Sequence, residues 1–174
     1  LQNQGHALLY TPFLNYADYD LEPSLAMMRH PNSVLGLGDG GAHVGMICDG
    51  SFPTSMLTHW TRDRTRGDLL DLAWVIKAQT RDTALAYGLS DRGVLAEGFK
   101  ADVNLIDYDR LRLGHPSIAY DLPAGGKRLV QPVEGYVATF VSGVAIQKEG
   151  VPTGALPGRL VRGAQIEPVA IAAE

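Results

Sequence analysis

The sequence predicts an α/β segment followed by a β-rich segment. Before residue 89, apolar residues recur at helical spacing, and a short apolar run at residues 34–37 is typical of a buried strand. After residue 89, helical spacing disappears, and short strand-like runs alternate with glycines and prolines. We therefore place a domain boundary near residues 88–91, with a loose tail after residue 163.

The composition limits the classes of partner. The chain has 174 residues, 45% of them hydrophobic, with a net charge of −4, which argues against a nucleic-acid or anionic-membrane partner. No apolar run approaches the roughly 18 residues that span a membrane. The single cysteine, Cys48, excludes an internal disulfide and a multi-cysteine metal site and fits a reducing compartment, so we expect a cytoplasmic protein. The chain begins at Leu1 without a signal-like segment, as a processed or truncated product would.

The first half of the chain carries the predicted helices. We expect a short strand at residues 7–10, a helix over residues 21–30, the buried strand Val34–Leu37 and a helix from Pro53 to about Arg64. A helix that leads directly into a buried strand is typical of an α/β fold.

Two further helices are expected before residue 89. Asp68 is a suitable N-cap for the first, and its predicted core face consists of Leu69, Leu72, Ala73 and Ile76. Thr80 is the expected N-cap of the second, residues 81–87, which Gly88 ends. Trp74, Ile76 and Leu85 are expected in the core.

The second half is expected to be built from strands. Residues 103–106 and 136–141 are strand-like, and Ser142-Gly143 predicts a two-residue hairpin turn into residues 144–146. Between the two strands we expect a long irregular insertion from Arg110 to Pro132.

A glycine-rich segment after the first buried strand carries the candidate chemistry. Asp39 lies in Gly38-Asp39-Gly40-Gly41, directly after residues 34–37. Glycines allow a ligand to approach the main chain, and catalytic groups of α/β barrels lie at the carboxyl ends of the strands. Asp39 is therefore the candidate catalytic residue. The alternative is that Asp39 only caps a turn, because Asp and Gly are ordinary turn residues.

Three stretches in this order resemble the amidohydrolase superfamily, and within it the D-aminoacylase-like N-acyl-D-amino-acid deacylases of amidohydrolase family 3. Residues 36–43, G-L-G-D-G-G-A-H, resemble the family's strand-eight G-S-D-G segment, with Gly38 where Ser is usual. Residues 93–107 are similar to the return from barrel to β-sandwich, with Ala101-Asp102 at its A-D pair. Residues 141–159 are similar to the closing stretch that ends in T-G-x-x-P-G-R.

The resemblance implies a fold and a reaction. Residues 1–89 would be the last strands and helices of a (β/α)8 metallo-hydrolase barrel, and residues 90–163 part of the small β-sandwich. The implied reaction is metal-dependent hydrolysis of the amide of an N-acyl-D-amino acid, a small-molecule substrate, with zinc as cofactor and Asp39 as the catalytic aspartate and a possible weak metal ligand. Zinc lowers the pKa of a bound water to about 7, and a nearby carboxylate can take the proton of that water.

The implied zinc ligands are not in this sequence. The family's His-x-His pair and its further ligands belong to earlier strands, and no two of the five histidines here are spaced as His-x-His. Zinc takes about four donors. We therefore expect the chain to be the C-terminal part of the enzyme, inactive unless the missing N-terminal part is supplied. The alternatives are a hydantoinase- or dihydroorotase-like specificity, or a non-catalytic fragment.

Several residues near Asp39 are candidates for substrate binding, namely Gly40, Gly41, His43 and Ser51. His43 follows Asp39 by four residues, and a histidine that is hydrogen-bonded within the loop is the alternative. Cys48 has no base beside it in sequence, so we expect a half-buried thiol and not a nucleophile.

Overall fold

The computed structural model describes residues 4, 7–9, 15–36 and 38–169. The chain forms two compact units, Leu1–Val34 and Leu35–Glu174. In the first unit, the short 3-10 turn Ala17–Tyr19 precedes helix α1 (Glu22–Arg29), whose buried residue is Leu25. The helix predicted over residues 21–30 is confirmed. It ends where His30 becomes extended, as a residue before proline prefers.

Neither predicted strand of the first forty residues is formed in the described part of the chain. Residues 7–9 and 34–36 are irregular, and Tyr10 and Leu37 lie outside the described residues. A strand needs a neighbouring strand to complete its backbone hydrogen bonds, and no described segment pairs with either run. The carbonyl of Leu35 instead accepts a hydrogen bond from the Thr83 hydroxyl at 2.9 Å.

The predicted helix from Pro53 is confirmed. Helix α2 (Phe52–Thr58) continues into a π-helical turn, η4 (His59–Asp63), and the run ends at an extended Arg64. Leu57 and Trp60 are buried. The guanidinium of Arg64 lies 4.8 Å from the centre of the Trp60 ring, so the end of the helix is held by a cation–π contact.

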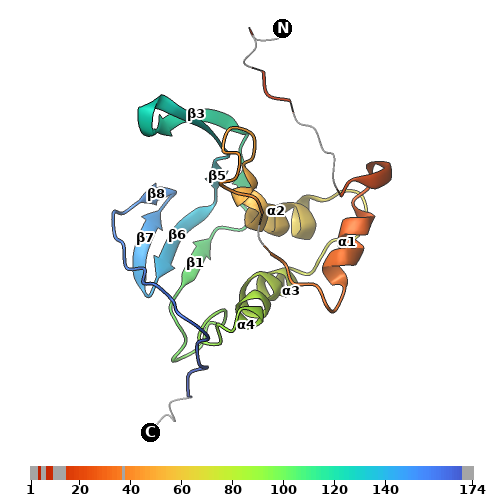
Figure 1. Cartoon of the computed structure of the whole chain (residues 1–174). Coiled ribbons are helices and arrows are strands. Elements are labelled where there is room, and N and C mark those ends of the chain that lie inside the picture. Colours follow the sequence, from red (N-terminus) through yellow and green to blue (C-terminus); the bar gives the residue numbers. More distant parts are fainter. Residues whose placement is uncertain (1–3, 5–6, 10–14, 37, 170–174) are drawn as a thin grey trace. The chain divides into compact units, whose positions relative to one another are not determined.

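The two helices predicted between residues 68 and 88 are one continuous helical run, which corrects both predicted N-caps. Helix α3 (Leu72–Lys77), the π-turn η5 (Ala78–Asp82) and α4 (Thr83–Ala86) follow one another without a break (Figure 1). Asp71, not Asp68, is the N-cap, and its carboxylate accepts a hydrogen bond from Trp74 N at 2.7 Å. Thr80 lies inside the run, where its hydroxyl donates to the carbonyl of Ile76.

The buried face of this run also differs from the predicted one. Val75, Ala78 and Ala84 are buried, whereas Ile76 and Leu85 are 42% and 46% exposed and Trp74 is half-buried. The prediction placed the start of the helix three residues too early. The buried face does not depend on that start. Leu72, Ala73 and Ile76 share one face of the helix as predicted, but that face is exposed. Each residue turns the helix by about 100°, so Val75 and Ala78 lie on a different face, and only packing decides which face is buried.

The predicted end of this run at Gly88 is confirmed. Gly88 has a φ of +71°. Its N–H bonds the carbonyl of Leu85 at 2.9 Å, and the next N–H, of Leu89, bonds Ala84 at 2.8 Å. This pair of bonds is the Schellman motif, which favours glycine at the left-handed position.

Strands form most of the regular structure that follows the helical run. The main sheet is antiparallel with the order β1-β6-β7-β8, where β1 is Val103–Ile106, β6 Tyr136–Val141, β7 Val144–Lys148 and β8 Val151–Pro152. In Figure 1 the labelled arrows of this sheet lie side by side. The predicted turn at Ser142-Gly143 is confirmed, with φ of +50° and +78° and with Val141 paired to Val144.

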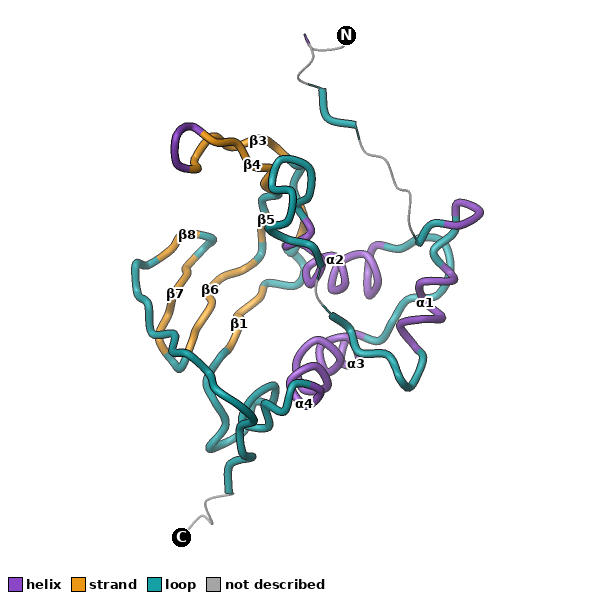
Figure 2. Tube along the Cα trace, viewed as in Figure 1, coloured by secondary structure: helices purple, strands orange, loops and turns teal. Residues whose placement is uncertain are grey.

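The insertion expected from Arg110 to Pro132 is not irregular. It contains β2 (Arg112–Leu113), β3 (Ser117–Leu122) and β4 (Gly126–Val130), and β5 (Val133–Glu134) follows it. β2 pairs with β5, and β3 with β4 across the 3-10 turn Pro123–Gly125 (Figure 2). The glycines and prolines that suggested a loop lie mainly at the turns between short strands.

Polar contacts connect the helical part of the second unit to strand β6 and to the segment between β1 and β2. The Thr54 hydroxyl lies 2.9 Å from the Tyr136 hydroxyl, and Thr61 lies 2.6 Å from Tyr108 in the same way. Arg62 donates to the carbonyl of Leu111 at 2.7 Å. The division into a barrel part, residues 1–89, and a sandwich part, residues 90–163, stays a prediction.

Residues 165–167 contact the end of the helical run within the second unit, whereas the sequence predicts a loose tail there. Gln165 N donates to the carbonyl of Gly88 at 2.7 Å, and Ser90 N donates to Gln165 at 3.1 Å, so Gln165 forms a parallel bridge with Leu89. Glu167 pairs with Arg81 at 3.0 Å. Within the described residues, no helix is long and apolar enough to cross a bilayer.

Candidate functional site

Asp39 lies in a chain of turns between Leu35 and helix α2. Residues 40–46 form consecutive turns, and Ala42 N donates to the carbonyl of Asp39 at 2.9 Å. The backbone of Asp39 therefore begins a turn, as expected if Asp39 were an ordinary turn residue and not a catalytic one. Its side chain does not cap that turn, because among the described residues the exposed Asp39 carboxylate has no hydrogen-bond or ion-pair partner.

The glycines around Asp39 allow the turns to pack against the start of α2. A β-carbon on Gly38 would lie 2.8 Å from both Asp49 Cβ and Phe52 Cδ2. A β-carbon on Gly40 would lie 3.0 Å from the backbone nitrogen of Gly50. Residues 38–40 are therefore in close contact with residues 49–52, and this contact leaves no room for side chains at residues 38 and 40.

Gly41 and His43, two of the predicted substrate-binding residues, lie exposed in the turns that follow Asp39. Gly41 is exposed with a φ of +96°, and His43 is exposed with a φ of +45°. The carbonyl of His43 accepts hydrogen bonds from Met46 N at 2.7 Å and from Ile47 N at 3.2 Å, so the backbone of His43 organises the turn. Contact of Gly40, Gly41, His43 or Ser51 with a substrate stays a prediction.

Ser51 has a partner that the sequence does not suggest. Its hydroxyl donates to Gln131 Oε1 at 2.6 Å, from a residue 80 positions away. A weaker bond joins the same hydroxyl to the carbonyl of Cys48 at 3.3 Å. Cys48 is half-buried, as predicted.

The described residues do not supply a zinc centre. No three His, Cys, Asp or Glu side chains come together in the described part of the chain. Zinc takes about four donors, so the residues that the structure describes do not fit a zinc ion, and Asp39 would be at most one ligand of several.

One half-buried histidine among the described residues has a buried ring nitrogen, and it lies in η4 and not beside Asp39. The Nε2 atom of His59, in η4, is buried without a hydrogen-bond partner among the described residues. Burial, followed by the nearby Arg64 guanidinium, lowers the pKa of His59, while Asp63 opposes the shift. The centres of the His59 and Trp60 rings lie 5.4 Å apart with the two rings nearly perpendicular, so we regard His59 as a structural residue.

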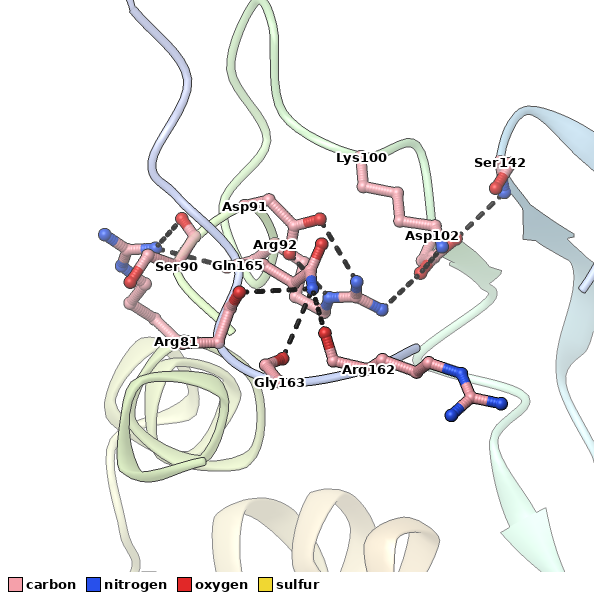
Figure 3. A network of polar contacts seen from close by, with 11 residues as sticks. Arg81, Ser90, Asp91, Arg92, Lys100, Asp102, Ser142, Arg162, Gly163 and Gln165 are labelled. Atoms are coloured by element: carbon pink, nitrogen blue, oxygen red, sulfur yellow. Dashed lines mark hydrogen bonds and ion pairs between the residues drawn. The ribbon is translucent and has the colours of Figure 1, made fainter. Parts of the chain in front are cut away.

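The stretch of residues 93–107 is also structural. The N–H of Ser142 donates to Asp102 at 2.8 Å, Arg92 lies 3.5 Å from the same carboxylate, and Arg92 forms a hydrogen-bonded pair with Asp91 (Figure 3). That hydrogen bond lowers the pKa of Asp91. The Asp102 carboxylate therefore holds the turn between β6 and β7.

Comparison with protein families assigns the chain to a family. Residues 6–147 match a sequence model of the amidohydrolase family, which covers most of the chain. The chain therefore belongs to the amidohydrolase family, a family of hydrolases that is generally metal-dependent. The comparisons with curated proteins and with solved structures gave no match. The D-aminoacylase-like subfamily, the zinc ion and the cytoplasmic location stay predictions.

Proposed function

We propose that this chain is the C-terminal part of an amidohydrolase that hydrolyses the amide bond of N-acyl-D-amino acids or related D-configured amides. The observation that carries the proposal is the exposed, unpartnered carboxylate of Asp39 among the described residues, held by a glycine-rich series of turns in a member of the amidohydrolase family. A carboxylate that makes no hydrogen bond or ion pair with other described residues is available to a reacting molecule.

The role of Asp39 follows from the chemistry of amide hydrolysis. Its carboxylate takes a proton from the water that attacks the acyl carbon, and it then delivers that proton to the leaving nitrogen. The products are a carboxylic acid and a free amine, here the D-amino acid. General acid–base catalysis of this kind typically contributes 10²–10⁴-fold to the rate.

Metal ligands would have to come from polypeptide outside the described residues, since these bring no three donors together. The isolated 174-residue chain is therefore expected to be inactive and to bind no stoichiometric zinc. Metal analysis of the purified chain checks this expectation, because one equivalent of tightly bound zinc would contradict it.

The test compares Asp39→Asn with Asp109→Asn in the complete polypeptide encoded by the reading frame. Asp109 is an exposed aspartate in the turn after β1 and serves as the matched control. We expect Asp39→Asn to lower kcat by about 10²–10⁴-fold and Asp109→Asn to leave it unchanged. Unchanged turnover in Asp39→Asn would refute the role of Asp39.

The substrate class is tested separately on the unaltered enzyme. N-acyl-D-amino acids, their L enantiomers, hydantoins and dihydroorotate are compared by kcat/KM. A preference for the D-configured acyl substrates is expected. A higher kcat/KM for the L enantiomers or for a cyclic amide would overturn the proposed substrate class. The role of Asp39 would be unaffected by that result, because the comparison of Asp39→Asn with Asp109→Asn tests it separately.

A further inference from the structure

The loop that carries Asp39, residues 38–51, is attached to a strand region far away in the sequence. Leu129 of β4 donates its N–H to the carbonyl of Val44 at 2.6 Å. The Ser51 hydroxyl donates to Gln131 Oε1 at 2.6 Å. The middle of the Asp39 loop is thus joined to β4 itself, and the end of the loop to Gln131 just after β4. Figure 2 shows the teal coil of the loop beside β4 and β5.

The side chain of Gln131 is held from both ends. Its Oε1 accepts from Ser51, and its Nε2 donates to the carbonyl of Gly114 at 3.0 Å. Gly114 in turn donates its N–H to the carbonyl of Pro132 at 2.8 Å. The amide is half-buried, so rotation of the side chain would break two hydrogen bonds in a partly desolvated place.

The Asp39 loop needs such an attachment. It contains five glycines, Gly38, Gly40, Gly41, Gly45 and Gly50, and glycine loses more conformational freedom on ordering than any other residue. β3 and β4 pair as an antiparallel hairpin, and Arg128 of β4 pairs with Asp121 of β3 at 2.7 Å. A flexible loop is therefore anchored to a hydrogen-bonded hairpin.

We propose that Gln131, acting through the Ser51 hydroxyl, is a positioning residue that holds the Asp39 loop in place for the reaction. The inference rests on the proposed function of Asp39. It also gives Ser51 a role other than the predicted substrate contact, because its hydroxyl donates a hydrogen bond to Gln131 and so anchors the loop. Proton transfer by Asp39 depends on its position, and a displacement of about 1 Å can cost 10²-fold in rate.

Cys48 offers a readout of the loop that does not depend on activity. It is half-buried, it lies within the Asp39 loop, and it is the single cysteine of the 174 residues. Its rate of reaction with a thiol reagent, followed by mass spectrometry of the peptide that carries Cys48, reports how often the loop opens. The measurement can be made on the complete polypeptide.

The variants are Gln131→Ala, Ser51→Ala, the double variant, Ser51→Thr and the control Gln147→Ala. Gln147 is an exposed glutamine of β7 with no side-chain hydrogen bond within the described residues. We expect Gln131→Ala and Ser51→Ala each to speed labelling of Cys48 by roughly 2- to 10-fold, the range for loss of one hydrogen bond. Cys48 of the double variant should be labelled only slightly faster than that of either single variant, because both substitutions remove the same hydrogen bond. Ser51→Thr keeps the hydroxyl, so its labelling rate should equal that of the unaltered enzyme.

Kinetics separate positioning from mere stability. Gln131→Ala should lower kcat by at least about 5-fold and change KM by less than about twofold, because the displaced group acts in the transition state. Equal labelling rates in Gln131→Ala, Gln147→Ala and the unaltered enzyme would overturn the inference. Faster labelling with unchanged kcat would also overturn it, since the loop would then be loosened without effect on the reaction. Failure of the proposed function would show instead as unaltered turnover in Asp39→Asn, whatever the labelling rates.

Discussion

The carboxylate of Asp102 accepts a hydrogen bond at 2.8 Å from the backbone N–H of Ser142, 40 residues later in the chain (Figure 3). The next residue, Gly143, donates its N–H to the carbonyl of Ala101 at 2.9 Å. The turn between β6 and β7 is thus fastened to the residues just before β1. The Ala-Asp pair of residues 101–102 therefore closes one end of the main sheet.

Replacing Asp102 with alanine should destabilise this end of the sheet. Asp102→Ala leaves the Ser142 N–H without its acceptor, and we expect a loss of about 1–2 kcal/mol in the free energy of unfolding. Asp102→Asn keeps an acceptor oxygen and loses only the ion pairs with Arg92 and Lys100, so it should be destabilised less. Urea unfolding measures both, and equal stability of Asp102→Ala and the unaltered protein would contradict the role.

Two glycines separate the cost of backbone strain from the cost of a clash. Gly135 has a φ of +99°, and a β-carbon there would lie 2.6 Å from Leu111 Cα. Gly150 has a φ of +75° with nothing within 4 Å of such a β-carbon. Gly150→Ala should cost about 1–2 kcal/mol, the strain alone, and Gly135→Ala about 1–3 kcal/mol more. Thermal or urea unfolding measures the difference, and equal losses would show that Leu111 moves away freely.

The glycine before Asp39 should not tolerate the serine that is usual at this place in the resembled motif. A β-carbon on Gly38 would meet Asp49 Cβ and the Phe52 ring at 2.8 Å, so we expect Gly38→Ser to cost about 1–3 kcal/mol. Gly45→Ala is the control, because its β-carbon would meet only Lys127 Cε, at 4.0 Å. Unfolding of the two variants is compared. Removing the Phe52 ring as well should recover part of the loss.

Stability should fall as the pH drops through the ordinary pKa of histidine. The pKa of His59 is lowered from 6.5 by burial and by Arg64, against the opposing effect of Asp63. Below pH 6.5 the unfolded chain therefore takes up a proton that the folded chain does not. The free energy of unfolding is highest above this pH and decreases until the lowered pKa of His59 is reached.

The free energy of unfolding between pH 7.5 and 5.5 tests the contribution of His59. His59→Gln should flatten the decrease, whereas His115→Gln, at an exposed position, should keep it. An unchanged decrease in His59→Gln would assign the pH dependence to other groups.

Local patterns predicted some elements well and failed at others for one physical reason. The turn at Ser142-Gly143 and the helix end at Gly88 were predictable, because positive φ favours glycine at these positions in any fold. The helix start was misplaced because both Asp68 and Asp71 are suitable N-caps, and only the packed structure selects between them. The residues 34–36 form no strand, since a strand is defined by its neighbours.

The amino-acid sequence by itself determined the amidohydrolase resemblance, the candidate Asp39 and the two glycine-dependent chain reversals. These features depend on residue type at short spacing. Only the tertiary structure decided that Ser51 bonds Gln131, that Asp102 holds the turn at Ser142, and that the Asp39 carboxylate has no partner within the described residues. The physical reason is that such contacts join residues 40 or 80 positions apart, and no local periodicity encodes which distant side chain completes a hydrogen bond.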